Sequence, residues 1–370
     1  MSVYHNLRIA LSAALLASAV GCADAVTAPA AGTSPAIPPP AAARNPSALA
    51  PVDLGSLGGS SIALSSEAHD INASGDIVGF GTPPGLFGAF GLHAILWRDG
   101  AILDLGTLGG TISRAWGINA DGVVVGGANT AGDFFVHAFV WRDGIMTDLG
   151  TLDGANASSV AFDIAPDGRI VGRIDRPNGS RLAVLWQDGA VTDLGSLGGR
   201  VSVAYAINPA GAIVGASETA AGEPHAFLWR DGTMVDLGTL GGTRSTAYAI
   251  NPSGDIVGSS TTVAGEEHAV LWRKGVIVDL GTVRGMRTVA MGINPSGQVV
   301  GYFAGPTLSS GGAFLWQRGV MTELSDALNE LPQNQLGLGP AHAYAITPAG
   351  EVVGDARGAM APHAALWTRK

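Results

Sequence analysis

Apolar residues along this chain come in short runs that are separated by turn residues. Ala247–Asn251 and Asp255–Gly258 are apolar arms on either side of a Pro-Ser-Gly turn, and His225–Trp229 and Thr233–Leu237 flank an Asp-Gly turn. Both patterns are typical of β-hairpins. No segment keeps the 3.6-residue period of an amphipathic helix. The pattern therefore predicts an all-β protein.

The hairpins belong to a repeat with three markers, each of which occurs seven times, mostly 43 to 45 residues apart. One marker is a tryptophan, at Trp97, Trp141, Trp186, Trp229, Trp272, Trp316 and Trp367. Another is the aspartate of a DLG step, at Asp53, Asp104, Asp148, Asp193, Asp236 and Asp279, with Glu323 in the seventh place. The third is a Val-Gly pair that ends at Gly79, Gly126, Gly172, Gly215, Gly258, Gly301 and Gly354. Four short strands in such a repeat form one blade of a β-propeller, so the sequence predicts seven four-stranded blades.

The ends of the repeat region predict how the propeller closes. Val52–Leu54 has the sequence of a fourth strand, and His363–Trp367 has the sequence of a third strand. We therefore expect the N-terminal strand to complete the C-terminal blade, which joins the two ends without a covalent bond and leaves no free sheet edge.

Two of the connections in each repeat vary in length, and both lie on the face of the disc opposite the hairpin turns. The longest are Phe80–Gly91 and Ser325–Pro340. Variable loops on a rigid scaffold commonly form binding sites, so we expect the functional surface on this face. The alternative is that insertions accumulate where they do least harm.

The joint between repeats has the glycines of a phosphate-binding loop, as in DLGTLGG at Asp104–Gly110 and Asp236–Gly242. Such loops hold the anion at the N-terminus of a following helix. Here a strand follows every copy, and no Lys-Ser/Thr pair is present. We therefore interpret the glycines as residues that permit a sharp return from one blade to the next, and we expect no nucleotide cofactor.

Residues 1–21 have the basic start and apolar core of a signal peptide. They lead into AVGC at residues 19–22, which resembles the lipobox of bacterial lipoproteins, although Ala19 stands where Leu is usual. The resemblance implies that Cys22 is acylated and becomes the new N-terminus. The protein is then expected on a bacterial membrane outside the cytoplasm, periplasmic or at the cell surface, or secreted if Cys22 is not acylated.

The remaining chain divides into a stalk and a folded part. Residues 22–50 are rich in Ala and Pro and are expected to form an extended tether, and residues 51–370 form the propeller. Cys22 is the only cysteine, so no disulfide stabilises the fold. The formal net charge of −10 argues against nucleic acid as a partner, and we expect a monomer whose membrane contact is the lipid.

The repeat resembles the HAF-type repeats of bacterial extracellular proteins. The resemblance rests on strands such as HAFLW at His225–Trp229, on the LGG joints and on hairpins of the form INxxGxIVG, and it covers nearly all of residues 51–370. Two copies depart from the pattern, with Leu182 and Gly312 in place of the histidine. The resemblance implies a propeller-like fold and an extracellular location, and it implies no reaction.

One histidine per repeat opens the third strand, at His93, His137, His225, His268 and His363. These residues are far apart on the ring, so we expect no metal site. We interpret them as structural partners of the DLG aspartates of their own blades, and we interpret the repeat tryptophans as core residues.

Candidate ligand residues lie where the repeats differ. Two positions before the repeat isoleucine, the copies carry His69, Trp116, Phe162, Tyr205, Tyr248, Met291 and Tyr344. Packing between blades accounts for most of this ring, and any part that lines the channel mouth forms a platform for sugar rings or peptide side chains. The loops just before it are expected to carry Arg114, Arg200, Arg244, Arg284 and Arg287, which together favour an anionic ligand.

Three functions remain open at this point. The leading hypothesis is a non-enzymatic module that binds a carbohydrate or a protein, with the candidates Trp116, Arg114, Tyr205, Arg200, Tyr248, Arg244, Arg287 and Tyr344. The second is a lyase or hydrolase of an envelope polymer that uses His69, Asp70 and Asp163. The third is a structural module of an envelope complex. No Ser-His-Asp, HExxH or paired-Glu spacing is present, which favours binding over catalysis.

Overall fold

The computed structural model describes residues 49–57, 65–84, 91–152, 154, 157–306, 310–324, 341–357 and 362–369. All of them belong to one compact unit, Pro38–Lys370. In these ranges the chain forms 28 strands and no helix, so the described part has no helix that is suited to cross a membrane. The signal peptide, Cys22 and the insertion Ser325–Pro340 lie outside the described residues, as do residues 85–90.

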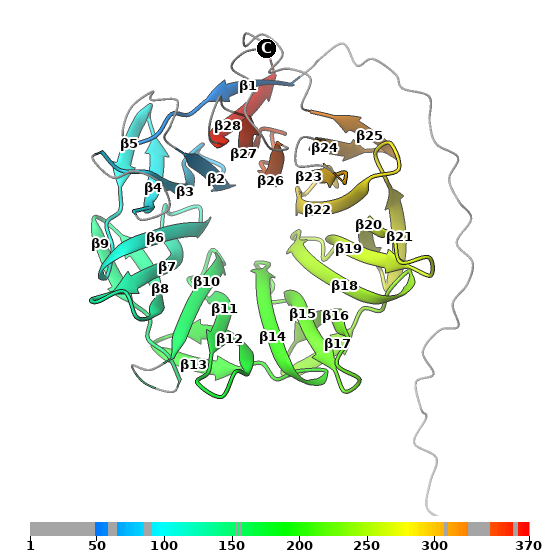
Figure 1. The fold of residues 1–370 in the computed structure, drawn as a ribbon, viewed down its shortest axis with the longest axis horizontal. Helices are drawn as coiled ribbons and strands as arrows, with labels where there is room; N and C mark the ends of the chain where they lie inside the picture. The colour runs from blue at the N-terminus through cyan, green and yellow to red at the C-terminus, as the bar shows by residue number, and fades with distance from the viewer. Residues whose placement is uncertain are drawn as a thin grey trace, which may run out of the picture. The chain divides into compact units, whose positions relative to one another are not determined.

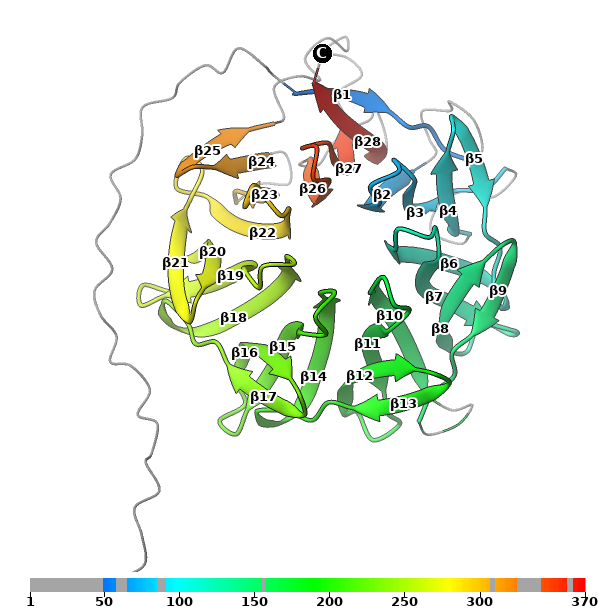
Figure 2. The ribbon, with the colours of Figure 1, turned by 180° about the vertical axis from the view of Figure 1, so that it is seen from behind.

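The strands pair in antiparallel groups of four that follow one another around a common centre (Figures 1 and 2). Two groups are β2 (Ser66–Ile71), β3 (Ile77–Gly81), β4 (His93–Arg98) and β5 (Ala101–Asp104), then β6 (Gly109–Ile118), β7 (Val124–Thr130), β8 (Val136–Arg142) and β9 (Ile145–Asp148). Next come β10 (Ser158–Ile164), β11 (Ile170–Asp175), β12 (Arg181–Gln187) and β13 (Ala190–Asp193), then β14 (Gly198–Ile207), β15 (Ile213–Thr219), β16 (Pro224–Arg230) and β17 (Thr233–Asp236). They are followed by β18 (Gly241–Ile250), β19 (Ile256–Thr262), β20 (Glu267–Arg273) and β21 (Val276–Gly281), then β22 (Arg287–Ile293), β23 (Val299–Ala304), β24 (Gly311–Gln317) and β25 (Val320–Glu323). The last group contains β26 (His342–Ile346), β27 (Val352–Arg357), β28 (Pro362–Arg369) and β1 (Leu49–Asp53).

The first strand of each group lies nearest the centre in Figure 1, and hydrogen bonding continues outwards in chain order. One parallel bridge, between Arg181 and Val201, joins β12 to β14, so the strands β10–β17 count as one eight-stranded sheet. All other pairs of named strands in the described part are antiparallel, and the remaining strands form four-stranded sheets. The prediction of an all-β chain of hairpins is confirmed.

The chain closes through its first strand. β1 pairs with β28 in antiparallel register, from Leu49 opposite Arg369 to Asp53 opposite Ala365. The predicted sharing of one sheet by the two ends is therefore present. The strand begins at Leu49, two residues earlier than the boundary at Pro51 that the sequence predicted, because the pairing with β28 extends the strand into the end of the Ala/Pro-rich segment.

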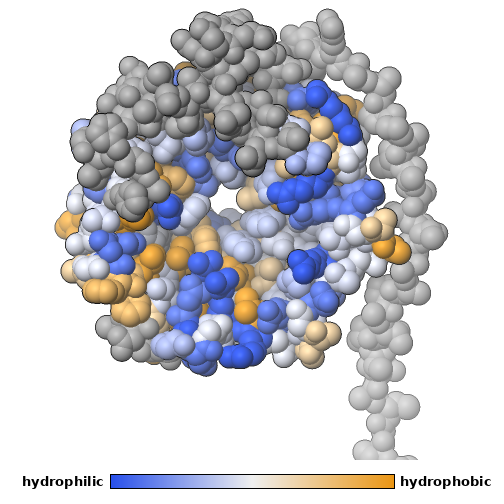
Figure 3. Space-filling view, in the orientation of Figure 1, coloured by the Kyte–Doolittle hydropathy of each residue, from blue (hydrophilic) through white to orange (hydrophobic). Residues whose placement is uncertain are grey.

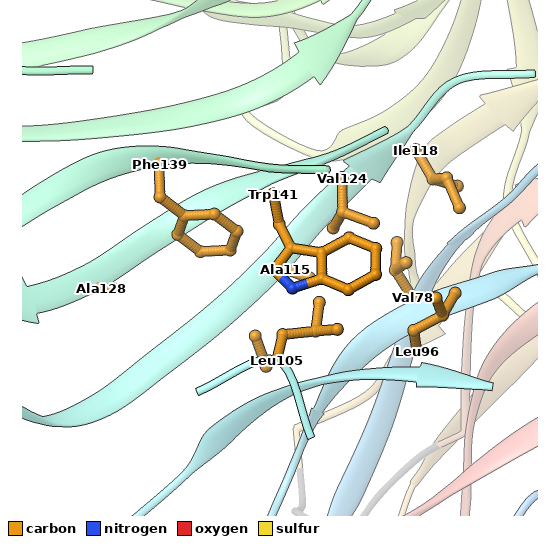
Figure 4. Packing of buried hydrophobic residues seen from close by; sticks show 10 residues of the cluster. Val78, Leu96, Leu105, Ala115, Ile118, Val124, Ala128, Phe139 and Trp141 are labelled. Carbon is orange, nitrogen blue, oxygen red and sulfur yellow. The ribbon is translucent and has the colours of Figure 1, made fainter. Parts of the chain in front are cut away.

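Apolar contacts between neighbouring sheets form the core. Trp141 of β8 lies in one buried cluster with Val78 and Leu96, which come from β3 and β4 of the preceding sheet (Figure 4). Trp141 is 5% exposed, and burial of an aromatic side chain of this size stabilises the fold by about 1.5–3 kcal/mol or more. The repeat tryptophan therefore joins sheets as well as filling them.

A row of asparagines also connects the sheets, a role that the sequence analysis did not identify. The Nδ2 of Asn251 donates to the carbonyl oxygen of Asn294 at 3.2 Å, and the Nδ2 of Asn294 donates to that of Thr347 at 3.1 Å. The Oδ1 of Asn251 accepts the backbone N–H groups of Ser253 and Asp255, which shapes its own hairpin turn. Each such asparagine thus fixes a turn and reaches the next sheet.

Candidate functional site

A β-bulge on the innermost strand places one side chain per sheet at the central channel. In each pairing of the first two strands the register shifts by one residue, for example between Ala247 and Ala249. The residues at the seven shifts are those that the sequence singled out, and we call them the bulge ring: His69, Trp116, Phe162, Tyr205, Tyr248, Met291 and Tyr344. Bulges of this kind redirect a side chain, which here turns it towards the channel.

The Val-Gly marker of the repeat is explained by this bulge. A methyl group on the glycine would overlap the carbonyl oxygen of the inner strand, which in the β18–β19 pair is the oxygen of Thr246 opposite Gly258. The same overlap occurs at Gly79, Gly126, Gly172, Gly215, Gly301 and Gly354. Glycine is therefore needed wherever an inner strand bulges, and the bulge orients the ring residue.

The bulge ring is a nearly continuous band of aromatic side chains. The ring centroids of Tyr205 and Tyr248 are 5.3 Å apart, and the imidazole of His69 lies 4.5 Å from both the Trp116 and the Tyr344 rings. Met291 interrupts the series. All seven side chains are partly exposed, and an opening is visible at the centre of the face shown in Figure 3. The band is thus accessible as well as packed.

A pocket of about 460 Å³ lies on one side of the ring. Tyr248, Met291 and Tyr344 line it together with Tyr302, His342, Arg287 and the loop residues Gly305, Pro306 and Ser310. The volume is in the range of sites for small ligands. Because the lining runs from the connection between β23 and β24 to the bulge ring, the pocket opens on the face that carries the variable connections.

The tyrosines of this region act as neutral hydrogen-bond groups. Burial raises the phenol pKa of each of them above its usual value: Tyr205, Tyr248, Tyr302 and Tyr344. They therefore remain protonated at physiological pH and can donate to a ligand.

The arginines are not gathered in the loops as predicted. Arg114 lies within β6, and its guanidinium stands 5.2 Å over the Phe80 ring. Arg287 begins β22, stands 5.7 Å over Tyr302 and pairs with Glu267 at 3.1 Å between Nη1 and Oε2. The inner strands β6, β14 and β18 begin at the second joint glycine and are ten residues long, so Arg114, Arg200 and Arg244 lie in strands, while Arg284 lies in the connection before β22.

The other three arginines lie away from these aromatic contacts. Arg200 donates from Nη2 to the carbonyl oxygen of Asn178 at 2.9 Å, and Arg284 pairs with Glu323 at 2.6 Å. The side chain of Arg244 is exposed, and only its backbone N–H and carbonyl make hydrogen bonds within the described ranges. Arg114 and Arg287 therefore lie beside aromatic rings of the site, and the expectation that the five arginines together favour an anionic ligand stays a prediction.

Several residues of the site were missed at the sequence level. They lie directly after the Val-Gly pair on the second strand, where every repeat has a different residue, or two positions before the bulge on the first strand, where the residue also varies: Glu67, Arg173, Tyr302, His342 and Asp355. The Nδ1 of His342 lies 2.9 Å from Oδ1 of Asp355, which is 4% exposed. Burial raises the pKa of Asp355, and the hydrogen bond from His342 opposes that rise. The signal available in the sequence was that the residue after the constant Val-Gly pair differs from one repeat to the next.

Asp70 and Asp163 have structural partners. Oδ1 of Asp70 accepts the N–H of Ile71 at 2.8 Å, and Oδ2 accepts the N–H of Ile118 in the next sheet at 2.9 Å. Asp163 bonds the N–H groups of Ile164 and Ile207 in the same way. Both carboxylates therefore connect one inner strand to the next.

The three candidate catalytic residues form no shared hydrogen-bond network. The Nε2 of His69 lies 3.3 Å from Oε2 of Glu67, and its ring stacks on Tyr344. Asp70 and Asp163 bond to backbone groups, and the charge of Asp163 acts on Asp70 only through repulsion. Among the described residues, no hydrogen bond therefore joins any two of His69, Asp70 and Asp163.

Asp70 makes the stability of the fold depend on pH. Burial, together with the charge of Asp163, raises the pKa of Asp70 to about 7. Because this folded-state value lies above the unfolded value, ionisation of Asp70 costs stability, and the cost grows as the pH rises from about 4 to about 7. We expect Asp70→Asn to reduce the loss of stability between pH 5 and pH 8 by on the order of 2 kcal/mol, or about 4–8 °C in Tm.

Thermal melts at the two pH values check this expectation. Asp76→Asn is the matched control, because the hydrogen bond from Arg98 lowers the pKa of Asp76 and its contribution is fully present at both pH values. An equal pH dependence of Tm in the wild type and in Asp70→Asn would contradict the expectation.

The repeat histidines and aspartates form the predicted pairs. The Nδ1 of His93 lies 2.8 Å from Oδ2 of Asp104, whose Oδ1 accepts the N–H of Gly106 at 2.8 Å. Equivalent His-Asp contacts join His137 to Asp148, His225 to Asp236, His268 to Asp279 and His363 to Asp53. Within the described residues no group of three or more His, Cys, Asp or Glu side chains is placed to hold a metal ion.

The contact between His363 and Asp53, which joins the two ends of the chain, shifts the pKa of both side chains. The hydrogen bond from His363 lowers the pKa of Asp53, and Asp53 raises the pKa of His363. The attraction between the two charged side chains therefore stabilises the fold at pH values between the pKa of Asp53 and the pKa of His363. The DLG joint is a structural element that holds the third and fourth strands of a sheet together.

Comparison with known proteins bears on the fold. No protein-family profile and no curated protein sequence matches the chain. Among solved structures, it is similar to the β-propeller domain of the Trilobed protease from Pyrococcus furiosus, with a TM-score of 0.54 and 8% identity over 83% of this chain and 96% of that one. YCF48 bound to D1 peptide matches with a TM-score of 0.50 and 13% identity, over 90% and 97%. The chain is a β-propeller.

The propeller also matches part of larger enzymes. A puromycin-hydrolyzing peptidase from Mycobacterium tuberculosis has a TM-score of 0.53 and 14% identity, over 86% of this chain and 52% of that one. The chain thus spans about half the length of that peptidase, and it spans 62% and 41% of two other matched chains. At these identities the likeness concerns the fold alone.

Proposed function

We propose that this propeller is a non-enzymatic binding module whose ligand, a carbohydrate or a protein, lies over the bulge ring. The observation that carries the proposal is the ring itself, a band of partly exposed aromatic side chains with tyrosine hydroxyls and charged groups beside it. Aromatic side chains of this kind supply contact area to sugar rings and to peptide side chains at little conformational cost.

We propose seven blades, each one copy of the repeat. Support comes from the antiparallel groups, each of which contains one bulge residue of the ring. The strands β10–β13 and β14–β17 count as two blades in this proposal, because a single parallel bridge joins them. The resemblance of the repeat to HAF-type extracellular repeats supports the same architecture.

The proposed location is outside the cytoplasm of a bacterium, with a lipid on Cys22 and residues 22–48 as the tether. The lipobox-like AVGC sequence supports acylation, and the extracellular setting of HAF-type repeats supports the compartment. We propose a monomer in which the lipid is the membrane contact and the ring faces its ligand.

Two observations favour binding over catalysis. Asp70 and Asp163 each accept a backbone N–H of the next sheet, and His69 contacts Glu67 of its own strand and stacks on Tyr344 of the neighbouring sheet. YCF48, which has a similar fold, is seen bound to a peptide, which supports a binding role for a propeller of this kind.

Substitutions in the ring test the proposal. Tyr205→Leu and Tyr248→Leu keep most of the side-chain volume and remove the aromatic face and the hydroxyl. On glycan and protein arrays probed with the full chain, we expect the double variant to bind the captured ligand about tenfold more weakly or worse, because such residues commonly contribute more than 1 kcal/mol each.

The matched control is Ile145→Ala, which changes an exposed apolar residue on the outer strand β9 and should leave binding unchanged. Circular dichroism melts establish that the variants are folded. Equal binding by the wild type and the folded ring variant, or no ligand on either array, would rule out the proposal.

A further inference from the structure

Two guanidinium groups lie over aromatic rings on either side of Trp116. Arg114 stands 5.2 Å over Phe80, and Arg173 of β11 stands 5.6 Å over Phe162. The Trp116 ring connects them, with centroid distances of 5.8 Å to Phe80 and 6.2 Å to Phe162. We call these five residues the arginine–aromatic subsite.

The subsite has more positive than negative charge. Arg114 makes no ion pair with a carboxylate among the described residues. Arg173 and Arg181 share one carboxylate, that of Asp175, at 3.3 Å and 2.5 Å from their Nε atoms. The Nε of Arg173 is buried and has no hydrogen-bond partner in the described part. Arg114, Arg173 and Arg181 thus carry three positive charges against two carboxylates, those of Asp175 and of Glu67, the register partner of Phe80, in a protein whose formal net charge is −10.

The other arginine at the channel serves as an internal comparison. Arg287 also stacks on a ring, that of Tyr302, but Glu267 neutralises it at 3.1 Å. Among the three arginines that lie over rings, the excess of positive charge therefore belongs to Arg114 and Arg173, on the side of the ring formed by β6, β10 and β11. An anionic ligand is attracted to this side in particular.

Stacking leaves the guanidinium edges free of the rings, and in Arg173, whose Nε is buried, the edge that can reach a ligand is formed by the Nη groups. A guanidinium that lies over a ring uses its flat face, so its edge can donate two parallel hydrogen bonds to a carboxylate. Trp116 and Phe162 are partly exposed between the two cations. The subsite thus alternates carboxylate-binding groups with flat apolar surfaces.

We propose that the arginine–aromatic subsite binds sugar units that bear a carboxylate, as in an acidic polysaccharide. A uronate ring carries both required features on one rigid unit: an apolar C–H face that stacks on Trp116 or Phe162, and a carboxylate that pairs with Arg114 or Arg173. An acidic peptide can pair with the arginines, but its carboxylates sit on flexible side chains that leave the aromatic faces uncovered. This proposal rests on the binding function proposed above and specifies its ligand.

The test is calorimetric titration of the full chain with tetragalacturonate. We expect binding by the wild type and at least about tenfold weaker binding by Arg114→Gln and by Arg173→Gln, since a charge-assisted hydrogen bond contributes about 1.5–3 kcal/mol. The matched control is Arg142→Gln, an exposed arginine at the end of β8 beside a hairpin turn, which should bind as the wild type does. Affinity should also fall as salt is added.

Two further probes decide the ligand class. The fully methyl-esterified tetragalacturonate has the same rings without the charge, and poly-glutamate has the charge without the rings. We expect both to bind at least about tenfold more weakly than tetragalacturonate. Equal binding of the ester, tighter binding of poly-glutamate, or unchanged affinity in both folded arginine variants would overturn the proposal. Because each arginine is tested separately, one variant that fails to fold leaves the other to decide.

The two proposals fail in different ways. If the arrays identify a neutral glycan or a protein whose binding depends on Tyr205 and Tyr248, while tetragalacturonate does not bind, the uronate subsite is wrong and the binding function stands. If nothing binds on the arrays or in the titrations, both are wrong.

Discussion

Deletion of Leu49–Asp53 is expected to lower the Tm by about 10 °C or more. The deletion removes β1, which provides the outer strand of the sheet β26–β28 through five register pairs with β28. It also removes the contact between Asp53 and His363, and it exposes the edge of β28 to solvent. A loss of several kcal/mol follows from these contacts, and each kcal/mol corresponds to about 2–4 °C in a domain of this size.

Scanning calorimetry of the full chain with and without the five residues measures the effect. Deletion of residues 40–44 is the control, since it shortens the chain by the same length outside the paired strand and should leave Tm unchanged. If both deletions shift Tm equally, the pairing of the two ends contributes nothing to stability.

A covalent link across the same strands should have the opposite effect. Ala50 and Thr368 are register partners, and a disulfide between cysteines at these positions would close a loop of more than 300 residues. In a background with Cys22→Ser, oxidation of the pair is expected to stabilise the fold by up to about 5 kcal/mol, because a long loop is closed in the unfolded state. Reduction should reverse the gain.

Gly258→Ala is expected to destabilise the protein by more than about 3 kcal/mol or to prevent folding. The added methyl group would overlap the carbonyl oxygen of Thr246 and lie 3.0 Å from the Cα of Ala247, both of which are backbone atoms. Relief requires the inner strand to lose its bulge or to separate from β19. Either change would also turn Tyr248 away from the channel, so a folded variant should bind ligand more weakly.

Gly275→Ala is the matched control for this substitution. Gly275 has a positive φ of 78° in the turn between β20 and β21, and no atom lies within 4 Å of the added methyl group. Its cost is therefore the backbone strain alone, about 1–2 kcal/mol. Urea titrations of both variants should show the larger effect at Gly258, and similar values would contradict the role of the bulge.

The parts of the structure that recur in every repeat could be predicted from the sequence. Periodic spacing identified Trp141 as a core residue and paired His93 with Asp104. Such positions depend on contacts within one repeat or between neighbouring repeats of the same pattern. The same physical requirement therefore selects the same type of residue in one repeat after another. The pairing of the two chain ends followed from the phase of the same markers.

The site itself could be predicted only in part. The column of bulge residues was found because it interrupts the pattern, but the bulge that aims Tyr248 at the channel is a feature of register that composition does not reveal. The His342–Asp355 pair joins two strands of a diverged repeat, and the role of Arg173 depends on Phe162 one strand away. A contact that occurs in only one repeat produces no recurring residue pattern, so it could not be found from the periodicity of the sequence.

Because the two chain ends share one sheet, the chain could be circularly permuted without loss of a strand pairing. β1 lies at the outer edge of its sheet, beside β28, so the break between the ends occupies the place of the hairpin turn between the third and fourth strands of the other sheets, as between β16 and β17. Joining residues 369 and 49 through a short linker and opening the chain at another of these turns, for instance at Gly232 between β16 and β17, would keep every sheet and the bulge ring. A lipid tether attached at the new N-terminus would then be joined to a different sheet of the propeller. The ligand site would stay unchanged.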